Sequence, residues 1–480
     1  MQTCIRARAS SFRSALACTS ILWLGVLILF GTLASRSTAQ TLPSAPVSRL
    51  IDLTPHPGFF NEPSIAVNPN NPRQIVAAYQ VAATAAFSSD AGEHWTLAST
   101  TAPKDYAVSG DVSVAFDNKG HAFLCYIAFD KLGTENYWAH NATRNGIFVR
   151  RSDNGGKTWN PEPSTVISHP TEPGIPFEDK PYIAADTNSK SPYAGNLYVG
   201  WTQFTLTKSV MLFSRSTDDG NTWSAPIEIS SREGLPRDDN GAVEGFSGAI
   251  APDGTLYAVW ADGDNIAFTS SKDGGKTFAP SKEVLDVAPL YFKISGVDRA
   301  NGFPQISLDP KANRLFVSWS DYRNGDVDIF VSTSEDSGAS WSSAVRVNSD
   351  PLHNGSDQFF QWLSVDPETG AAYVVFYDRR DDPKNKSTIV VLARSTDGGL
   401  IFQNYAWTRK AFESRDDFIG DYTGIAAFNG RVYGIWAEEA GSASSANVRT
   451  RNRKPQAPPE EIDNHRTIVR IGVADFGKSN

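Results

Sequence analysis

The chain has 480 residues, of which 40% are hydrophobic and 20% charged, and its formal net charge is −9 at pH 7. This acidic balance argues against nucleic acids and anionic membranes as partners, because both carry charge of the same sign. Only three cysteines and seven scattered histidines are present, which disfavours a disulfide framework and a zinc site.

The first 39 residues have the pattern of a secretory leader. Three arginines precede an apolar stretch, Ile21 to Ala34, and Ser37-Thr38-Ala39 before Gln40 fits a cleavage site. An uncleaved membrane anchor is the alternative, although the apolar stretch is short for a span. We therefore expect a secreted or periplasmic mature chain, which carries 40 basic and 53 acidic residues and a net charge of −13.

Short apolar strands that end in an aromatic residue recur along the rest of the chain. The last five terminal aromatics are 59, 59, 58 and 59 residues apart. The seven strands are Ile75 to Tyr79, Ala122 to Tyr126, Leu197 to Trp201, Leu256 to Trp260, Leu315 to Trp319, Tyr373 to Tyr377 and Val432 to Trp436. A fixed long period indicates one supersecondary unit repeated along the chain.

Most of these strands follow another apolar strand and a turn, and a loop and a third strand come after them. The repeating unit is therefore a four-stranded antiparallel blade, and we predict an all-β fold, a β-propeller, in one domain from residue 40 to residue 480. The predicted blades lie near residues 60–100, 109–165, 179–230, 244–286, 303–348, 358–408 and 419–452.

A turn motif with Asp, Gly and an aromatic residue occurs six times. The copies begin at Ser88, Ser152, Ser216, Ser271, Ser334 and Ser395 and end at Trp95, Trp159, Trp223, Phe278, Trp341 and Phe402. The carboxylate of Asp caps backbone N–H groups, and Gly adopts dihedral angles that other residues resist. We expect the aromatic ring to fill the space between neighbouring blades.

This motif resembles the Asp-box of the bacterial neuraminidase repeat, which is found in sialidases and other secreted β-propellers. In those families the Asp-box is structural and performs no chemistry. Sialidases have six blades, whereas the strands here predict seven; six blades with one divergent hairpin is the alternative. The seventh unit lacks an Asp-box, and its third strand is predicted at Asn447 to Arg451. Its outer strand is either Val47 to Leu53 or Arg466 to Phe476.

Two kinds of loop converge on one face of a propeller, around the central axis, and these loops select the candidate site residues. Those that lead into the innermost strands carry Glu62, Asp111, Asp179, Lys180, Glu244, Gln361, Asp421 and Tyr422. Those that leave the second strands carry Gln203, Asp262, Asp321, Tyr322, Arg323, Tyr377, Asp378, Arg379, Arg380 and Glu438. For any single residue, capping a strand end or pairing between blades is the alternative to a functional role.

The resemblance to sialidases also implies chemistry. Those enzymes use a Tyr nucleophile activated by Glu, an Asp acid/base and three Arg. The segment Asp421-Tyr422-Thr423 is similar to the one that carries the nucleophile, and Glu244 is similar to its partner. Asp179 or Asp421 would be the acid/base. Asn61-Glu62-Pro63 stands where the family has Arg-Ile-Pro.

We expect substrate contacts from residues of both loop types, with two arginines clamping an acidic sugar's carboxylate. They are Arg323, Arg379, Asp321, Asp378, Glu62 and Lys180. The predicted function is a secreted glycoside hydrolase acting on glycans with acidic sugars, as a monomer. The alternative is a non-catalytic extracellular propeller that binds a glycan or a protein. No cofactor is expected, and the acidic turns at 262–264 and 378–382 are the candidates for calcium.

Overall fold

The computed structural model of the chain describes residues 42–80, 82–98, 105–131, 142, 144–171, 176–414, 418–440 and 466–477. The predicted leader, residues 1–39, and the strand predicted at 447–451 lie outside these ranges. Within them the secondary structure consists of strands, apart from turns and loops. None of the described segments forms a helix of the length and apolar character needed to cross a membrane.

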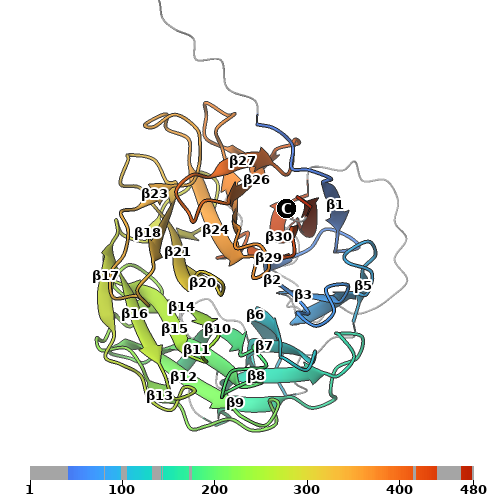
Figure 1. Cartoon of the computed structure of the whole chain (residues 1–480), viewed down its shortest axis with the longest axis vertical. Helices are drawn as coiled ribbons and strands as arrows, with labels where there is room; N and C mark the ends of the chain where they lie inside the picture. The colour runs from blue at the N-terminus through green and yellow to red at the C-terminus, as the bar shows by residue number, and fades with distance from the viewer. Residues whose placement is uncertain are drawn as a thin grey trace, which may run out of the picture. The chain divides into compact units, whose positions relative to one another are not determined.

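Seven four-stranded antiparallel sheets surround a central axis, so the predicted seven-bladed β-propeller is confirmed (Figure 1). The first two blades are β2 (Asn61–Val67), β3 (Ile75–Gln80), β4 (Thr84–Ser88) and β5 (Thr96–Leu97), then β6 (Val108–Phe116), β7 (Ala122–Phe129), β8 (Asn145–Ser152) and β9 (Ser164–His169). The next two are β10 (Phe177–Ala185), β11 (Leu197–Phe204), β12 (Ser209–Ser216) and β13 (Ile227–Glu228), then β14 (Val243–Ile250), β15 (Leu256–Asp262), β16 (Asn265–Ser271) and β17 (Lys282–Asp286). Blades five and six are β20 (Gln305–Asp309), β21 (Arg314–Asp321), β22 (Asp328–Ser334) and β23 (Val345–Arg346), then β24 (Gln358–Val365), β25 (Ala372–Asp378), β26 (Ser387–Ser395) and β27 (Gln403–Ala406), with β28 (Phe412–Glu413) also paired to β26.

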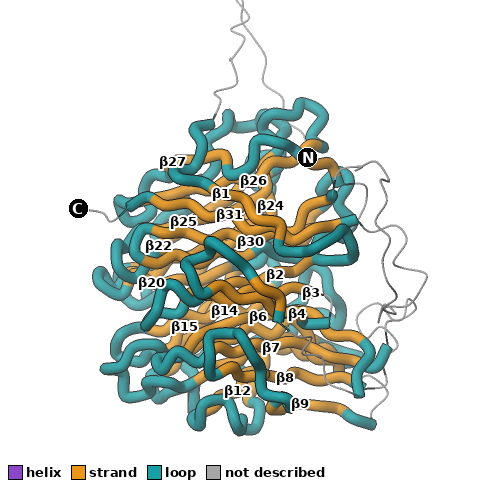
Figure 2. Tube along the Cα trace, turned by 90° about the vertical axis from the view of Figure 1, so that its right-hand side faces the viewer, coloured by secondary structure: helices purple, strands orange, loops and turns teal. Residues whose placement is uncertain are grey.

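The seventh blade is assembled from both ends of the propeller. Its order is β29 (Gly424–Phe428), β30 (Arg431–Glu439), β31 (Thr467–Asp475) and β1 (Arg49–Asp52). The two segments considered for the outer strand therefore both belong to this blade: β1 is outermost, and β31 takes the third position (Figure 2). Ile51 pairs with Ile471, and the N–H of Leu53 donates to the carbonyl of Val469 at 2.8 Å. This pairing closes the ring and covers an edge that would otherwise be open.

The core lies between the blades, and the second strands fill it most completely. The four tryptophans within such strands, Trp201, Trp260, Trp319 and Trp436, are almost fully buried. The innermost strands are joined by serine side chains, since the hydroxyl of Ser64 accepts the N–H of Val114 in the next blade at 3.1 Å. Such direct links hold the mouths of adjacent blades in a fixed relation.

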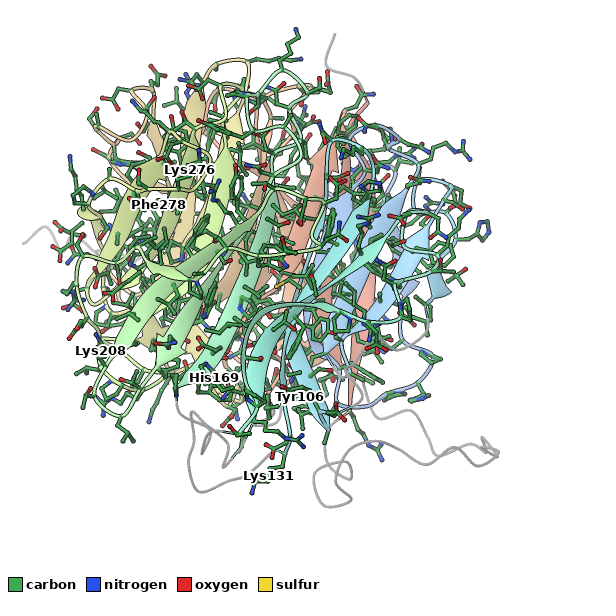
Figure 3. The ribbon with its side chains drawn as sticks, turned by 90° about the horizontal axis from the view of Figure 1, so that it is seen from below. Tyr106, Lys131, His169, Lys208, Lys276 and Phe278 are labelled. Atoms are coloured by element: carbon green, nitrogen blue, oxygen red, sulfur yellow. The ribbon has the colours of Figure 1, made fainter. Side chains whose placement is uncertain are left out.

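The six repeated turns lie on the face opposite the mouth. Lys276 and Phe278 belong to one of these turns, whereas Lys208 and Lys131 lie in loops that follow second strands. Figure 3 shows the two pairs on opposite faces of the propeller. The ring of Phe278 packs edge-on against Phe213 of the preceding blade, with 4.7 Å between ring centroids. The aromatic residues of these turns therefore seal the blade interfaces, as their spacing predicts.

In the second turn, Ser152 to Trp159, Asp153 is the one acidic residue, so the sequence predicts its carboxylate as the cap. The structure places Asn154 there: its side-chain oxygen accepts the N–H of Thr158 at 2.9 Å and the hydroxyl of Ser152 at 3.0 Å. Asp153 instead pairs with Arg151 at 2.6 Å on the surface. In each of these turns the capping residue stands two positions after the Ser. At that position the side-chain amide of Asn caps the backbone as the carboxylate of Asp does.

This difference predicts a contrast between two neighbouring substitutions. Asn154→Ala should lower the free energy of unfolding by about 1–2 kcal/mol, because it removes a cap for backbone N–H groups. Asp153→Ala should cost less than about 1 kcal/mol, since an exposed ion pair contributes little. Urea denaturation of the two variants measures both values, and a larger loss in Asp153→Ala would contradict this assignment.

Candidate active site

Five of the seven innermost strands carry a bulge at the mouth. At each bulge one residue has a positive φ, between 48° and 81°: Glu62, Asp111, Lys180, Gly245 and Phe360. Left-handed backbone is unfavourable for residues other than Gly, and such conformations gather at functional sites. In three successive blades a strained backbone conformation thus places an ionisable side chain, Glu62, Asp111 or Lys180, at an equivalent position around the axis.

Lys180 is the centre of the resulting cluster, and its side chain is only 6% exposed. Its ammonium nitrogen lies 2.9 Å from a carboxylate oxygen of Glu244 and 3.2 Å from one of Asp421. Asp238 and Asp179 follow at 3.4 and 3.6 Å. Burial alone would lower the pKa of Lys180, but these four carboxylates outweigh it and raise the pKa well above its usual value.

Two loops that run over the mouth complete the cluster. One precedes β14 and carries Asp238; the other contains the short strands β18 (Tyr291–Phe292) and β19 (Ala300–Asn301) and carries Arg299. The guanidinium of Arg299 donates to Asp238 at 2.6 Å and to both oxygens of Asp421 at 2.5 and 2.9 Å. The hydroxyl of Tyr291 donates to Glu244 at 2.6 Å and also contacts Asp238.

The carboxyl groups fall into two electrostatic classes. Burial, together with neighbouring carboxylates, raises the pKa of Asp111 to about 8 and those of Glu62 and Asp179 to about 7. Asp111 influences the pKa values of both other groups and is influenced by Glu62 in turn. For Asp238, burial alone would raise the pKa, but Arg299 and then Lys180 lower it below its usual value. Carboxyl groups with a raised pKa thus lie beside Asp238, whose pKa is lowered.

The raised pKa of Asp111 predicts how stability depends on pH. The folded chain holds this proton up to about pH 8, whereas the unfolded chain loses it near the ordinary value of 3.8. The stabilisation is therefore complete below that ordinary value and is lost as the pH rises toward 8. Asp111→Asn should reduce the slope of unfolding free energy between pH 5 and 8 by up to about 1.4 kcal/mol per pH unit. Urea titrations at several pH values measure this slope, and the exposed Glu233→Gln variant should not change it.

Tyr422 lies beside the cluster, at the wall of a pocket on the propeller axis. Its ring is 5.6 Å from that of Trp362, and Trp362 is 6.0 Å from Tyr182. Burial and the carboxylates of Glu62 and Asp111 raise the pKa of Tyr422 well above its usual value. The pocket is lined by these aromatics together with Lys180, Asp421 and Gln361.

The structure thus brings together six residues predicted for the site: Tyr422, Asp421, Asp179, Glu244, Glu62 and Lys180. It pairs Glu244 with the hydroxyl of Tyr291, however, and not with Tyr422 as the sialidase resemblance implied. The carboxyl groups of Glu62, Asp111 and Asp421 are the ones that raise the pKa of Tyr422, after burial.

Four predicted substrate contacts lie outside the cluster and have other partners. Arg323 is paired with Asp321, two residues earlier, at 2.5 Å. Arg379 is completely buried and donates to the carbonyls of Ser295 and Asn385 at 2.8 and 2.7 Å. Asp378 is paired with Arg380 at 2.6 Å. These side chains support the loops of blades five and six, and no carboxylate clamp forms from the two arginines.

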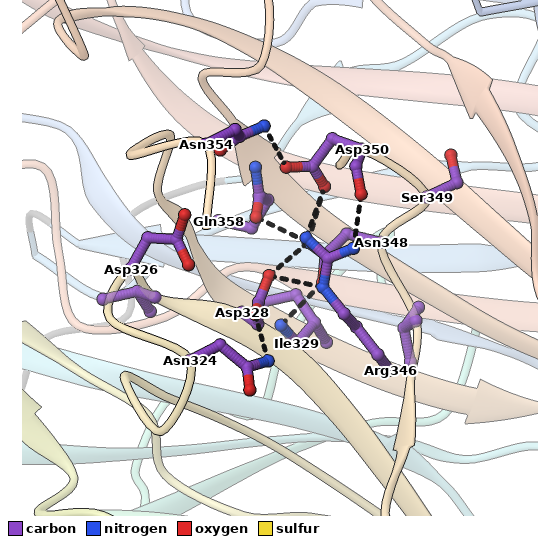
Figure 4. A network of polar contacts seen from close by, with 12 residues as sticks. Asn324, Asp326, Asp328, Ile329, Arg346, Asn348, Ser349, Asp350, Asn354 and Gln358 are labelled. Carbon is purple, nitrogen blue, oxygen red and sulfur yellow. Dashed lines mark hydrogen bonds and ion pairs between the residues drawn. The ribbon is translucent and has the colours of Figure 1, made fainter. Parts of the chain in front are cut away.

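The acidic turns considered for calcium are also occupied by protein groups. Asp262 is bound by Arg232, and Asp382 accepts the backbone N–H groups of Lys386 and Ser387 at 2.9 and 2.7 Å. A related arrangement stands at the end of blade five in Figure 4, where Arg346 lies between Asp328 and Asp350 at 2.7 and 3.0 Å. The amide of Asn348 links it to blade six by donating to the side-chain oxygen of Gln358 at 2.6 Å. These contacts are those expected of strand-end caps and interblade links.

The cluster itself has the composition of a metal site but contains its own cation. Carboxylate oxygens of Asp179, Asp238 and Glu244 lie within 4.8 Å of one another. The ammonium of Lys180 contacts all three, so it supplies the positive charge that a divalent ion would supply. The residues present therefore do not call for a metal.

Sequence reasoning missed Asp238, Tyr291 and Arg299 as site residues. All three lie in connections between blades that share no motif with the repeated unit. The sequence feature that could have revealed them is the length of the connections before β14 and before β20, which are long enough to reach the axis. Asp111 was placed at the mouth but was not assigned a role.

Comparisons with known proteins give the chain no family. No protein-family profile matches it, and no curated protein does. Solved structures similar to it include the Hadza microbial sialidase Hz136, with 14% identity, a TM-score of 0.47, and coverage of 84% of this chain and 73% of that one. The GH93 α-L-arabinofuranosidase of Fusarium graminearum has 11% identity, a TM-score of 0.47, and coverage of 78% and 95%. A protein of unknown function from Dyadobacter fermentans has 15% identity, a TM-score of 0.44, and coverage of 70% and 96%. Likenesses this distant carry no argument about chemistry, which must come from the site.

Proposed function

We propose that the chain is a secreted glycoside hydrolase with its active site at the axial mouth. The observation that carries this proposal is one buried cluster in which the pKa of Asp179 is raised and that of its neighbour Asp238 is lowered. Cleavage of a glycosidic bond needs one carboxylic acid to donate a proton and one carboxylate to act as nucleophile or base. Environments that separate the pKa values of neighbouring carboxyl groups divide these two roles between them.

In this proposal Asp179 is the acid, because its pKa is raised to about 7 and it remains largely protonated at mildly acidic pH. It gives its proton to the oxygen of the leaving sugar. Asp238 or Asp421, each bound by Arg299, provides the carboxylate. Oxygens of Asp179 and Asp238 lie within 4.8 Å, which favours direct attack by the carboxylate, since inverting enzymes keep their carboxyl groups further apart to admit water.

Tyr422 keeps its proton in this setting, so we assign it a donor role toward the substrate rather than that of a free phenolate. Lys180 and Arg299 hold the carboxylates in place and limit their mutual repulsion. The acidic-sugar preference expected from the sequence loses its basis, because the arginines meant to clamp a carboxylate lie elsewhere and both mouth cations are already paired.

Turnover by the purified mature chain on a broad glycan panel tests this proposal. Sugar release should fall by at least about 100-fold in Asp179→Asn, in line with the loss of a general acid. Lys208→Gln, which changes an exposed ion pair on the same face, should retain full activity. A folded chain that releases no sugar from any substrate would contradict the proposal.

A non-catalytic glycan-binding propeller is the second candidate. It is favoured by the closure of the cluster, because the side chains of Lys180, Asp238 and Asp421 are only 6, 6 and 2% exposed. In that case Asp179→Asn would change affinity at most, and the wild-type chain would bind glycans without cleaving them.

A further inference from the structure

The mouth contains many more carboxyl groups than cations. Six carboxyl groups contribute to it: Glu62, Asp111, Asp179, Asp238, Glu244 and Asp421. Its two cations, Lys180 and Arg299, are already shared among these groups, with contacts between 2.5 and 3.6 Å. Both cations are paired with Asp238 and Asp421, so an anionic ligand finds no unpaired cation here, whereas a cationic ligand can replace one of the two at these carboxylates.

Arg299 identifies the place where such a cation fits. Its guanidinium is held by Asp238 on one side and, through two hydrogen bonds, by Asp421 on the other. It also lies over the ring of Phe418, 4.8 Å from the centroid, and Phe418 is 6.3 Å from Phe59. Two carboxylates and an aromatic face are the elements that bind organic cations. The side chain of Arg299 is 37% exposed, the highest value among the ion-paired residues of the cluster, so solvent reaches this place.

A second observation points to a ligand that donates hydrogen bonds. Gln361 lines the axial pocket with Lys180, Asp421 and Tyr422, and it is 97% buried. Its amide nitrogen donates to the carbonyl of Phe303 at 2.8 Å, which fixes the orientation of the amide. Within the described part of the chain its side-chain oxygen has no donor. Buried acceptors usually have a partner, so this oxygen calls for an N–H or O–H group.

We propose that the mouth binds a cationic glycan, with the ammonium group of an amino sugar taking the place at Asp238 and Asp421 that the guanidinium of Arg299 fills. This inference rests on the proposed function, since it names the substrate class of the same site. Arg299 then acts as an internal competitor that keeps two carboxylates paired until a sugar ammonium replaces it. The hydroxyl groups of the same sugar supply donors for Gln361 and for the remaining carboxylates.

Calorimetric titration of the full mature chain tests this directly, with a tetramer of glucosamine and a tetramer of N-acetylglucosamine at pH 6 and low salt. The two probes differ in charge and share their linkage. We expect the glucosamine tetramer to bind at least tenfold more tightly, with a preference that declines as salt is added. Equal affinity for the two tetramers would overturn the inference.

Variants at the two ends of the guanidinium locate the binding place. Asp238→Asn and Asp421→Asn should each weaken binding of the glucosamine tetramer at least tenfold, and thermal unfolding verifies that each variant is folded. Glu233→Gln removes one exposed carboxylate on the same face and should leave the affinity unchanged. Arg299→Gln removes the internal competitor and should strengthen binding severalfold. Weaker binding in Arg299→Gln, or unchanged binding in Asp238→Asn, would contradict the proposed place.

The titration, combined with the turnover assay on the same glycans, separates failure of this inference from failure of the proposed function. Hydrolysis of an uncharged glycan with no preference for glucosamine would leave the hydrolase standing and remove the amino-sugar assignment. Tight binding of the glucosamine tetramer that depends on Asp238, without product, would keep the cation site and remove the hydrolase.

Discussion

Replacement of Lys180 by methionine is expected to lower the free energy of unfolding by about 3–5 kcal/mol at pH 8 and to abolish turnover. The ammonium contacts four carboxylates within 3.6 Å, and its side chain is almost fully buried. Methionine fills a similar volume but leaves these carboxylates uncompensated in a place where water cannot screen them. The loss is large because the partners stay buried when the cation is removed.

The deficit should depend on pH in a definite direction. Without the ammonium, the pKa values of Glu244 and Asp179 rise further, because its positive charge lowers both. Protonation then relieves the repulsion, and at pH 5 it costs less free energy than at pH 8. We expect the deficit at pH 5 to be less than half of that at pH 8.

Urea denaturation of the wild type and the variant at the two pH values measures this difference. Lys208→Met is the matched control, because Lys208 forms an exposed pair with Glu233 and its loss should cost less than about 1 kcal/mol at either pH. An equal deficit for Lys180→Met at pH 5 and pH 8 would show that the lost contribution is packing and not charge.

Lys180 also illustrates how much of the site the sequence could reveal. The start of every innermost strand meets the mouth, so counting blades was enough to collect Glu62, Asp111, Lys180 and Tyr422 on one face. Repetition made this step secure, because each blade repeats the same geometry around the axis. The bulges that turn these residues inward carry no motif that a sequence shows.

The ion-pair partners of the candidate residues were much less predictable than their positions in the blades. Arg323 and Arg379 have the residue type that an acidic substrate needs, yet one is paired with Asp321 and the other is buried against Phe359, Ser295 and Asn385. An arginine binds whichever acceptor the fold brings closest, and residue type alone does not specify that acceptor. Asp238 and Arg299 escaped notice for the opposite reason, since they reach the axis from long connections outside the repeat.

The closure of the ring also shows that segments can be predicted from the sequence more readily than their pairing. The sequence identified both terminal segments as candidates for one outer strand: Val47 to Leu53 because it is similar to the strands that follow the repeated turns, and Arg466 to Phe476 as its competitor. Only the pairing in space shows that the seventh blade needs both, with Thr467–Asp475 inside and Arg49–Asp52 outside. The prediction of Val47 to Leu53 as the outer strand is confirmed, whereas the third position belongs to Thr467–Asp475 and not to the predicted 447–451.

Removal of residues 40–53 is therefore expected to destabilise the propeller by about 5 kcal/mol. Leu53 is 94% buried, Ile51 packs on the same core, and burial of such side chains contributes about 1.5–3 kcal/mol each. Residues 42–45 are lost as well; they pair with Ala406 of β27, so the segment also joins the seventh blade to the sixth. For a chain of this size, about 5 kcal/mol corresponds to a fall in Tm of roughly 5 °C.

The truncated chain should also self-associate, because the deletion leaves β31 as an open strand edge that can pair with another molecule. Scanning calorimetry measures the Tm, and light scattering over a range of concentrations measures association. Val47→Ser is the control, since this side chain is 76% exposed and its replacement should change the free energy of unfolding by less than about 0.5 kcal/mol. A monomeric truncated chain with an unchanged Tm would mean that β1 adds nothing to closure. Cleavage after Ala39 would keep residues 40–53. The mass of the mature chain therefore tests whether the predicted cleavage site leaves the segment that closes the ring.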